Sequence, residues 1–127
     1  DGPLAVMVNE FSASASEIVA GTMQDYDRGA VIGEKSFGKG LVQVSKALSY
    51  NAQLKVTTAK YYTPAGRCIQ VLDYSHRRDD GSVGSLPDSL KRPFKTTNGR
   101  TVYDGGGIEP DITVPSPETH ALTQTLY

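Results

Sequence analysis

Apolar residues along the chain fall mostly in short runs, which are typical of strands. Leu4 to Val8 is apolar throughout, the pattern of a buried strand that is parallel or central in its sheet. Later runs are β-branched or alternate between apolar and polar residues, and Ser49 to Ala52 reads as a hairpin connection between two of them. These later strands are expected at Ala30–Gly33, Leu41–Val44, Gln53–Tyr62, Thr101–Tyr103 and Ile112–Val114.

One helix is predicted, directly after the first strand. From Ala15 to Met23 the residues of one face recur at helical spacing. A serine between residues 12 and 14 should cap the N-terminus of this helix, and Glu17 is an acid placed where the helix dipole favours one. The helix should end between Asp27 and Gly29, with Gly29 as its C-terminal cap.

The segment 72–100 differs from the rest of the chain because it is polar and rich in turn residues. It reads as a loop-rich excursion with at most one short helix, around Pro87 to Leu90. A loop of this length in a compact domain is a candidate for a surface that faces a substrate or a partner. Strand, helix and then several strands predict an α/β fold, and the length of 127 residues predicts a single domain, residues 1–127.

Composition narrows the classes of function. Thirteen basic and fourteen acidic residues leave a net charge of −1, so no overall charge attracts nucleic acid or an anionic membrane. The single cysteine, Cys68, excludes an internal disulfide and a cysteine-based metal cluster. No run approaches the length of a membrane span. The chain begins without a methionine, in what reads as the middle of a domain, and we expect it to be a piece of a longer protein.

The segment GEKSFGKG, residues 33–40, matches most of the phosphate-binding pattern G-x-x-x-x-G-K-[ST]. Two requirements of that site are missing. Gly40 stands where a hydroxyl should bind magnesium, and Leu41 begins a predicted strand where a helix should begin. A nucleotide-binding domain is therefore a weak alternative, and Lys39 is either a solvated lysine or a residue with another function.

A serine between a strand and a helix is well placed to act as a nucleophile, because the first amides of the helix are unpaired. The run SASAS offers Ser12, Ser14 and Ser16. The only histidines, His76 and His120, lie in polar stretches with no nearby motif. A lysine can replace histidine as the base when burial lowers the pKa of its amine. The setting of Lys39, between glycines and beside an apolar strand, could provide such burial.

Several motifs resemble those of the carboxyl-terminal processing proteases, also called tail-specific proteases. The resemblance is carried by residues 9–21 (NEFSASASEIVAG) and 33–43 (GEKSFGKGLVQ), and continues through 61–67 and 106–111. It implies that Ser14 is the nucleophile, that Lys39 is the general base, and that Gln43 orients the lysine. The N–H of Ala15 is then one oxyanion donor. In an extended segment the Cα atoms of residues 39 and 43 are about 13 Å apart, so their contact requires a bend near Gly40.

The family resemblance also implies an architecture and a setting. The fold would be part of the spiral ββα core shared with Clp protease and crotonase, with a mixed sheet and one main helix after the first strand. A PDZ domain and a glycine-rich turn that supplies the second oxyanion donor would lie outside this chain, so the fragment alone is expected to be inactive or very weak. The substrate would be a polypeptide with a flexible C-terminal tail, the compartment extracytoplasmic, often the periplasm, and no metal or organic cofactor would be needed. The oligomeric state stays open.

The other class of function for this chain is a non-catalytic module that presents a groove to a peptide or partner protein. Such a module has no need for Lys39 or Gln43, so the presence of Ser14, Lys39 and Gln43 together favours the protease.

Overall fold

The computed structural model describes residues 2–115, which form one α-helix, α1 (Ala15–Asp25), and nine short strands. His120 lies outside these residues. The strands are β1 (Ala5–Val8), β2 (Ala30–Gly33), β3 (Leu41–Ala47), β4 (Gln53–Lys60), β5 (Leu72–Arg77), β6 (Val83–Ser85), β7 (Pro93–Lys95), β8 (Thr101–Tyr103) and β9 (Ile112–Thr113), with 3₁₀ turns at Ser49–Asn51 and Asp88–Leu90. The α/β class predicted from the sequence is confirmed.

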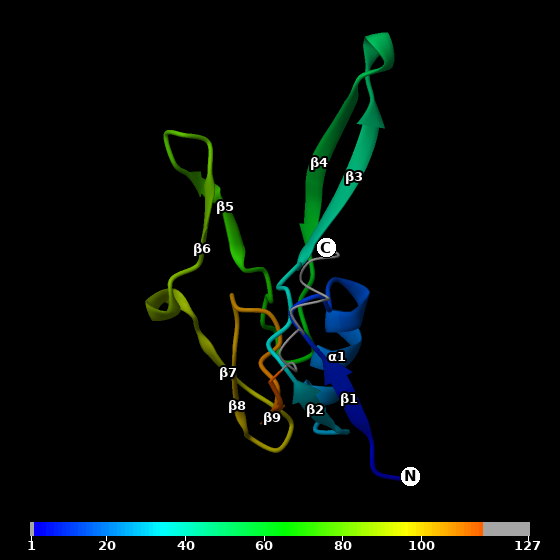
Figure 1. Cartoon of the computed structure of the whole chain (residues 1–127), viewed down its shortest axis with the longest axis vertical. Helices are drawn as coiled ribbons and strands as arrows, with labels where there is room; N and C mark the ends of the chain where they lie inside the picture. Colours follow the sequence, from blue (N-terminus) through cyan, green and yellow to red (C-terminus); the bar gives the residue numbers. More distant parts are fainter. Residues whose placement is uncertain (1, 116–127) are drawn as a thin grey trace, which may run out of the picture.

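The body of the molecule is a parallel sheet in the order β1-β2-β9, with α1 as the connection between β1 and β2 (Figure 1). The predicted parallel pairing of the first strand is confirmed. Its predicted burial is wrong, because β1 lies at the edge of the sheet and Met7 is 86% exposed. Side chains alternate between the two faces of a strand, and only the Val8 side of β1 packs into the core.

The core is small and lies where α1, the sheet and two later loops meet. Its buried side chains are Val8, Ala20, Val31, Ile69 and Ile108. Gly21 lets Ile108 approach the helix closely, because a Cβ there would lie 2.9 Å from the Ile108 Cδ1 atom. The loop before β9 is therefore packed directly onto α1.

Two antiparallel hairpins, β3–β4 and β5–β6, extend from the same side of the body as separate arms (Figure 1). The β3–β4 hairpin confirms the predicted pair of strands, although β3 continues to Ala47, three residues beyond the prediction. A bulge between Val42 and Gln43 interrupts its register. Leu54 and Val56 are 47% and 41% exposed, so this arm carries apolar side chains in contact with solvent.

Segment 72–100 has more regular structure than the sequence predicts. The short 3₁₀ turn at Asp88–Leu90 matches the expected helix, but the strands β5, β6 and β7 were not predicted, so the loop-rich description is wrong in that respect. The β5–β6 strands are joined by a tight turn in which Gly81 has a φ of 79°. The two strands of this hairpin lie in solvent and are mostly polar. Strand prediction relies on a pattern of apolar residues, so strands of this kind are not detected from the sequence.

The C-terminus of α1 also differs from the prediction. The helix ends at Asp25 with Tyr26 as its cap, and the left-handed residue that follows is Asp27, with a φ of 51°. A glycine is needed at position 29 for a steric reason instead, since a Cβ there would lie 2.7 Å from the Leu4 carbonyl oxygen.

Within residues 2–115, no helix has the length and apolar character that crossing a membrane requires.

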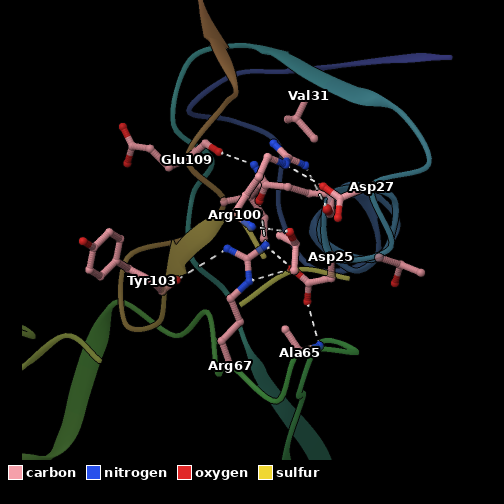
Figure 2. Close-up of polar contacts among 12 residues, drawn as sticks. Asp25, Asp27, Val31, Ala65, Arg67, Arg100, Tyr103 and Glu109 are labelled. Carbon is pink, nitrogen blue, oxygen red and sulfur yellow. Dashed lines mark hydrogen bonds and ion pairs between the residues drawn. The ribbon is translucent and has the colours of Figure 1, made fainter. Parts of the chain in front are cut away.

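Charged side chains fix the C-terminal end of α1 to two distant segments (Figure 2). Arg67 and Asp25 form an ion pair of 2.7 Å, with side-chain exposures of 1% and 0%. The same guanidinium donates to Gln24 Oε1 at 2.6 Å, and the Ala65 N–H donates to the second oxygen of Asp25 at 3.0 Å. A buried ion pair with its remaining donors and acceptors satisfied holds the turn after β4 against the helix.

A second arginine, Arg100, reaches the same end of the helix from the turn before β8 (Figure 2). It donates to Asp27 and Asp111 at 2.5 Å each, and to the Gln24 carbonyl oxygen at 3.1 Å. Desolvation would raise the pKa of Asp27, but hydrogen bonds from the Asn98 N–H and from Arg100 outweigh it, so the pKa lies below its usual value. The pair between Arg100 and Asp27 therefore persists into acid.

Asp25→Asn should strongly destabilise the fold, because it leaves the buried Arg67 guanidinium without a counter-ion. We expect the free energy of unfolding to fall by about 3–5 kcal/mol, measured by urea denaturation followed by circular dichroism. Asp79→Asn, at an exposed position in the β5–β6 turn, is the matched control and should change stability by less than about 0.5 kcal/mol. Equal unfolding midpoints for the two variants would contradict the assigned role of Asp25.

Candidate active site

Ser14 occupies the junction between β1 and α1, and it is the N-cap of the helix. Ser14 thus takes the cap position predicted within residues 12–14, although its side chain makes no cap hydrogen bond. Its φ of 55° and ψ of −111° place a non-glycine residue in a sparsely populated region of backbone space. Strained residues of this kind persist where surrounding contacts hold them, and a sharp strand-to-helix turn of this type exposes a serine hydroxyl in several hydrolases.

Of the two backbone N–H groups at Ser14 and Ala15, one donates a hydrogen bond within the protein and the other is unpaired. The Ser14 N–H donates to Glu17 Oε2 at 2.9 Å, within the first turn of the helix. The N–H of Ala15, the first residue of α1, has no acceptor among residues 2–115, as is usual for the first amides of a helix. An unpaired N–H beside a serine is the arrangement that an oxyanion donor requires.

The loop between β2 and β3 binds the same glutamate. The Gly38 N–H donates to Glu17 Oε1 at 2.6 Å, and the Lys39 N–H donates to Oε2 at 2.8 Å. No helix begins at Lys39, and β3 begins at Leu41 as the sequence predicts. Backbone amides of this phosphate-loop-like segment thus bind a carboxylate of the protein itself.

Further contacts join this loop to the start of α1. The Ser36 hydroxyl donates to Glu17 Oε1 at 2.5 Å and accepts the Ile108 N–H at 2.7 Å. The Phe37 N–H donates to the Ser12 carbonyl oxygen at 3.0 Å. The two sequence motifs that contain Ser14 and Lys39 therefore meet in the structure, although they are far apart in the chain.

The side chain of Lys39 is exposed, so the burial of its amine that the sequence suggested is not seen. Lys39 and Gln43 line one pocket of about 270 Å³, together with Leu41 between them and Tyr74 of β5. Positions 39, 41 and 43 thus lie on one side, as alternation predicts. Ser14 is not among the residues that line this pocket. The pocket opens to solvent between the two arms, which accounts for the exposure of the lysine.

Gln43 and His76 have other partners. The Gln43 amide nitrogen donates to Thr57 Oγ1 at 3.3 Å, across the β3–β4 hairpin, and within residues 2–115 no hydrogen bond joins Gln43 to Lys39. The exposed His76 Nδ1 is 2.6 Å from Asp73 Oδ2, and this hydrogen bond holds the pKa of Asp73 below its usual value. The structure thus brings Lys39 and Gln43 to one pocket, and it pairs His76 with an aspartate rather than with a serine.

From the sequence, Glu17 was predicted only to interact favourably with the helix dipole, and no role was predicted for Ser36. The pattern Ser-x-x-Glu at residues 14–17 signals a capped helix start, which is local information. Nothing in it predicts that the same carboxylate also binds a loop around residue 38.

Among residues 2–115, no group of three histidine, cysteine, aspartate or glutamate residues is arranged to bind a metal ion.

Gly38→Ala should disturb this loop. Gly38 has a φ of 86°, and a Cβ there would lie 2.1 Å from the Val71 Cγ2 atom. Gly81 has a φ of 79° with no atom within 4 Å of a Cβ, so Gly81→Ala introduces the same backbone strain without a clash. We expect Gly38→Ala to lower the free energy of unfolding by about 1–3 kcal/mol more than Gly81→Ala does. Urea denaturation of both variants measures the difference, and equal losses would show that Gly38 is needed for its φ alone.

Comparison with known proteins gives one consistent result. The family model for peptidase family S41 matches residues 1–74. A carboxy-terminal-processing protease of Bartonella bacilliformis is 56% identical over 68 residues, which are 54% of this chain and 16% of that protein. A carboxyl-terminal-processing protease of Synechocystis sp. is 56% identical over 90 residues, which are 71% of this chain and 18% of that protein.

A solved structure agrees with these relatives. The photosystem II D1 C-terminal processing protease superposes with a TM-score of 0.58 and 33% sequence identity. The match covers 89% of this chain and 20% of that protein, so the similarity continues past the S41 match into the later strands. The chain spans less than a fifth of the length of the two relatives with which it was compared.

Proposed function

The chain belongs to peptidase family S41, and on that premise we propose that it is part of a serine endopeptidase that cleaves proteins near their C-termini. The whole enzyme is much longer than this chain, as its relatives are. The PDZ domain and the second oxyanion donor then belong to segments outside residues 1–127. The isolated chain is expected to cleave peptides very weakly or not at all, because loss of one oxyanion contact costs on the order of 10²–10³ in rate.

The proposed reaction is covalent acyl transfer. The Ser14 hydroxyl attacks the carbonyl carbon of the scissile peptide bond while Lys39 accepts the hydroxyl proton. This step requires that the bound substrate, or segments outside this chain, cover the exposed Lys39 amine and favour its neutral form. The Ala15 N–H donates to the oxygen that becomes negatively charged. The C–N bond then breaks as Lys39 returns the proton to the leaving amine, and water hydrolyses the acyl-enzyme. None of these steps needs a metal or an organic cofactor.

The observation that carries this proposal is the shared binding of Ser14 and Lys39 to one oxygen atom. Both backbone nitrogens lie within 2.9 Å of Glu17 Oε2, so the two residues are neighbours in the fold. The strained conformation of Ser14 and the unpaired Ala15 N–H add the features of a nucleophile and an oxyanion donor.

Gln43 is placed where it could assist Lys39. It lines the same pocket as Lys39, and its amide oxygen can accept a hydrogen bond from the lysine while its nitrogen donates to Thr57. We assign it the orientation of the Lys39 amine during catalysis. The substrate is a polypeptide with a flexible C-terminal tail, and we place the enzyme in an extracytoplasmic compartment, such as the periplasm.

Labelling with a fluorophosphonate probe tests the proposal directly. The probe phosphonylates activated serines, so the full-length protease should be labelled, and mass spectrometry should locate the label on Ser14. A non-catalytic binding module would remain unlabelled while still binding a tail peptide. Absence of label on Ser14 in protein that cleaves a tail peptide would contradict the assignment of the nucleophile.

A further inference from the structure

Glu17 takes no part in the proposed proton transfer, yet four donors converge on its carboxylate. Oε1 accepts from the Ser36 hydroxyl at 2.5 Å and from the Gly38 N–H at 2.6 Å. Oε2 accepts from the Ser14 N–H at 2.9 Å and from the Lys39 N–H at 2.8 Å. The residue is 0% exposed. This one side chain therefore connects the segment that contains the proposed nucleophile to the segment that contains the proposed base.

These hydrogen bonds are the means by which a carboxylate is kept in the interior. Within residues 2–115, no lysine, arginine or histidine forms an ion pair with Glu17. Three of the four donors are backbone N–H groups, which can only donate, and two of these bind Oε2 while the third binds Oε1. Both oxygens of Glu17 thus act as acceptors. A buried carboxylate without a cation is stable only when donors such as these surround it.

We propose that Glu17 is a positioning residue that sets the separation and orientation of Ser14 and Lys39. This role rests on the proposed function, because it assumes that these two residues react together. The bond to the Ser14 N–H helps to hold that residue in its strained conformation. The bonds to Gly38 and Lys39 fix the backbone directly at the proposed base, in a loop that is also held by the Phe37 N–H.

Glu17→Gln is the most informative substitution, because it preserves size and removes only one acceptor oxygen. With the new amide NH₂ at the Oε2 position, it faces the N–H groups of Ser14 and Lys39. At the Oε1 position it faces the Gly38 N–H and the Ser36 hydroxyl, which can turn to accept. In either orientation at least one hydrogen bond from a backbone N–H is lost and replaced by a repulsive pair of donors. The variant should therefore misplace Ser14 relative to Lys39 without leaving a cavity.

The test measures kcat and KM for a tail peptide with the full-length protease. Glu17→Gln should lower kcat about 10²-fold, the loss that a misplacement of about 1 Å can cause, while KM changes less than about 3-fold. Asp25→Asn is the matched control, since it also neutralises a buried carboxylate of α1 but lies at the other end of the helix. Assayed at a temperature at which circular dichroism shows both variants folded, Asp25→Asn should keep kcat within about 3-fold of the parent.

Each result of this experiment either supports or overturns the positioning role of Glu17. An equal fall of kcat in both variants, or an unchanged kcat in Glu17→Gln, would overturn the positioning role. If Glu17→Gln does not fold, Ser36→Ala replaces it, since it removes one donor and keeps the carboxylate; kcat should then fall about 10-fold, and an unchanged kcat overturns the role. Ser14→Ala, assayed in parallel, separates the two hypotheses, because full activity in that variant would refute the proposed function itself.

Discussion

Ser14→Ala is expected to reduce kcat of the full-length protease about 10⁴–10⁶-fold, the range seen when a serine nucleophile is removed from a hydrolase. Without the hydroxyl, no acyl-enzyme can form, and only substrate binding and the oxyanion donors remain. KM should change little because the side chain is small. The measurement is cleavage of a tail-bearing protein, followed by gel electrophoresis and mass spectrometry of the released peptide.

Ser16→Ala is the matched control for this experiment. Ser16 belongs to the same SASAS run and is exposed on the first turn of α1. Its replacement should leave kcat within about 2-fold of the parent, as is usual for surface positions. Loss of activity in Ser16→Ala with retention in Ser14→Ala would show that the nucleophile was assigned to the wrong serine.

Lys39→Met should reduce kcat at least about 10²–10⁴-fold, the contribution of a general base. Methionine keeps the length and apolar part of the side chain but cannot accept a proton. Lys39→Arg should not restore activity, because a guanidinium stays protonated in proteins and is not a base. The rate of fluorophosphonate labelling of Ser14 is the second measurement, since it reports activation of the hydroxyl independently of peptide binding.

Lys46→Met controls for the loss of a positive charge. Lys46 lies on the exposed β3–β4 arm and should be dispensable for labelling. If Lys39→Met were labelled as fast as Lys46→Met, the base would have to be another group, and His76 would be the next residue to test.

The sequence predicted the elements with an apolar or β-branched pattern, such as β3 and β4, better than the polar ones. The start of α1 was predictable because Ser14 and Glu17 form a local capping pattern. The β5–β6 arm was missed because β5 is mostly polar, β6 has only three residues, and neither strand contains a buried residue. The end of α1 was misplaced because Asp27 adopts a left-handed conformation for which Gly29 was the obvious candidate.

The candidate site shows a similar division. Ser14, Lys39 and Gln43 were predicted from motifs, which need no knowledge of the fold. The role of Glu17 depends on a contact with Gly38 across 21 positions of the chain, and no periodicity encodes it. The exposure of Lys39 was also beyond prediction, because it depends on the separation of two arms of which one was not foreseen.

The fastening of α1 at both ends has a consequence for biosynthesis. Its N-terminal end is held through Glu17 by residues near position 38, and its C-terminal end by Arg67 and Arg100. A nascent chain emerges from the ribosome in order, and domains fold as units. Both ends of α1 can therefore be fastened only after Arg100 has been synthesised. The helix that begins at Ser14 thus completes its contacts late in synthesis, when most of this chain has left the ribosome.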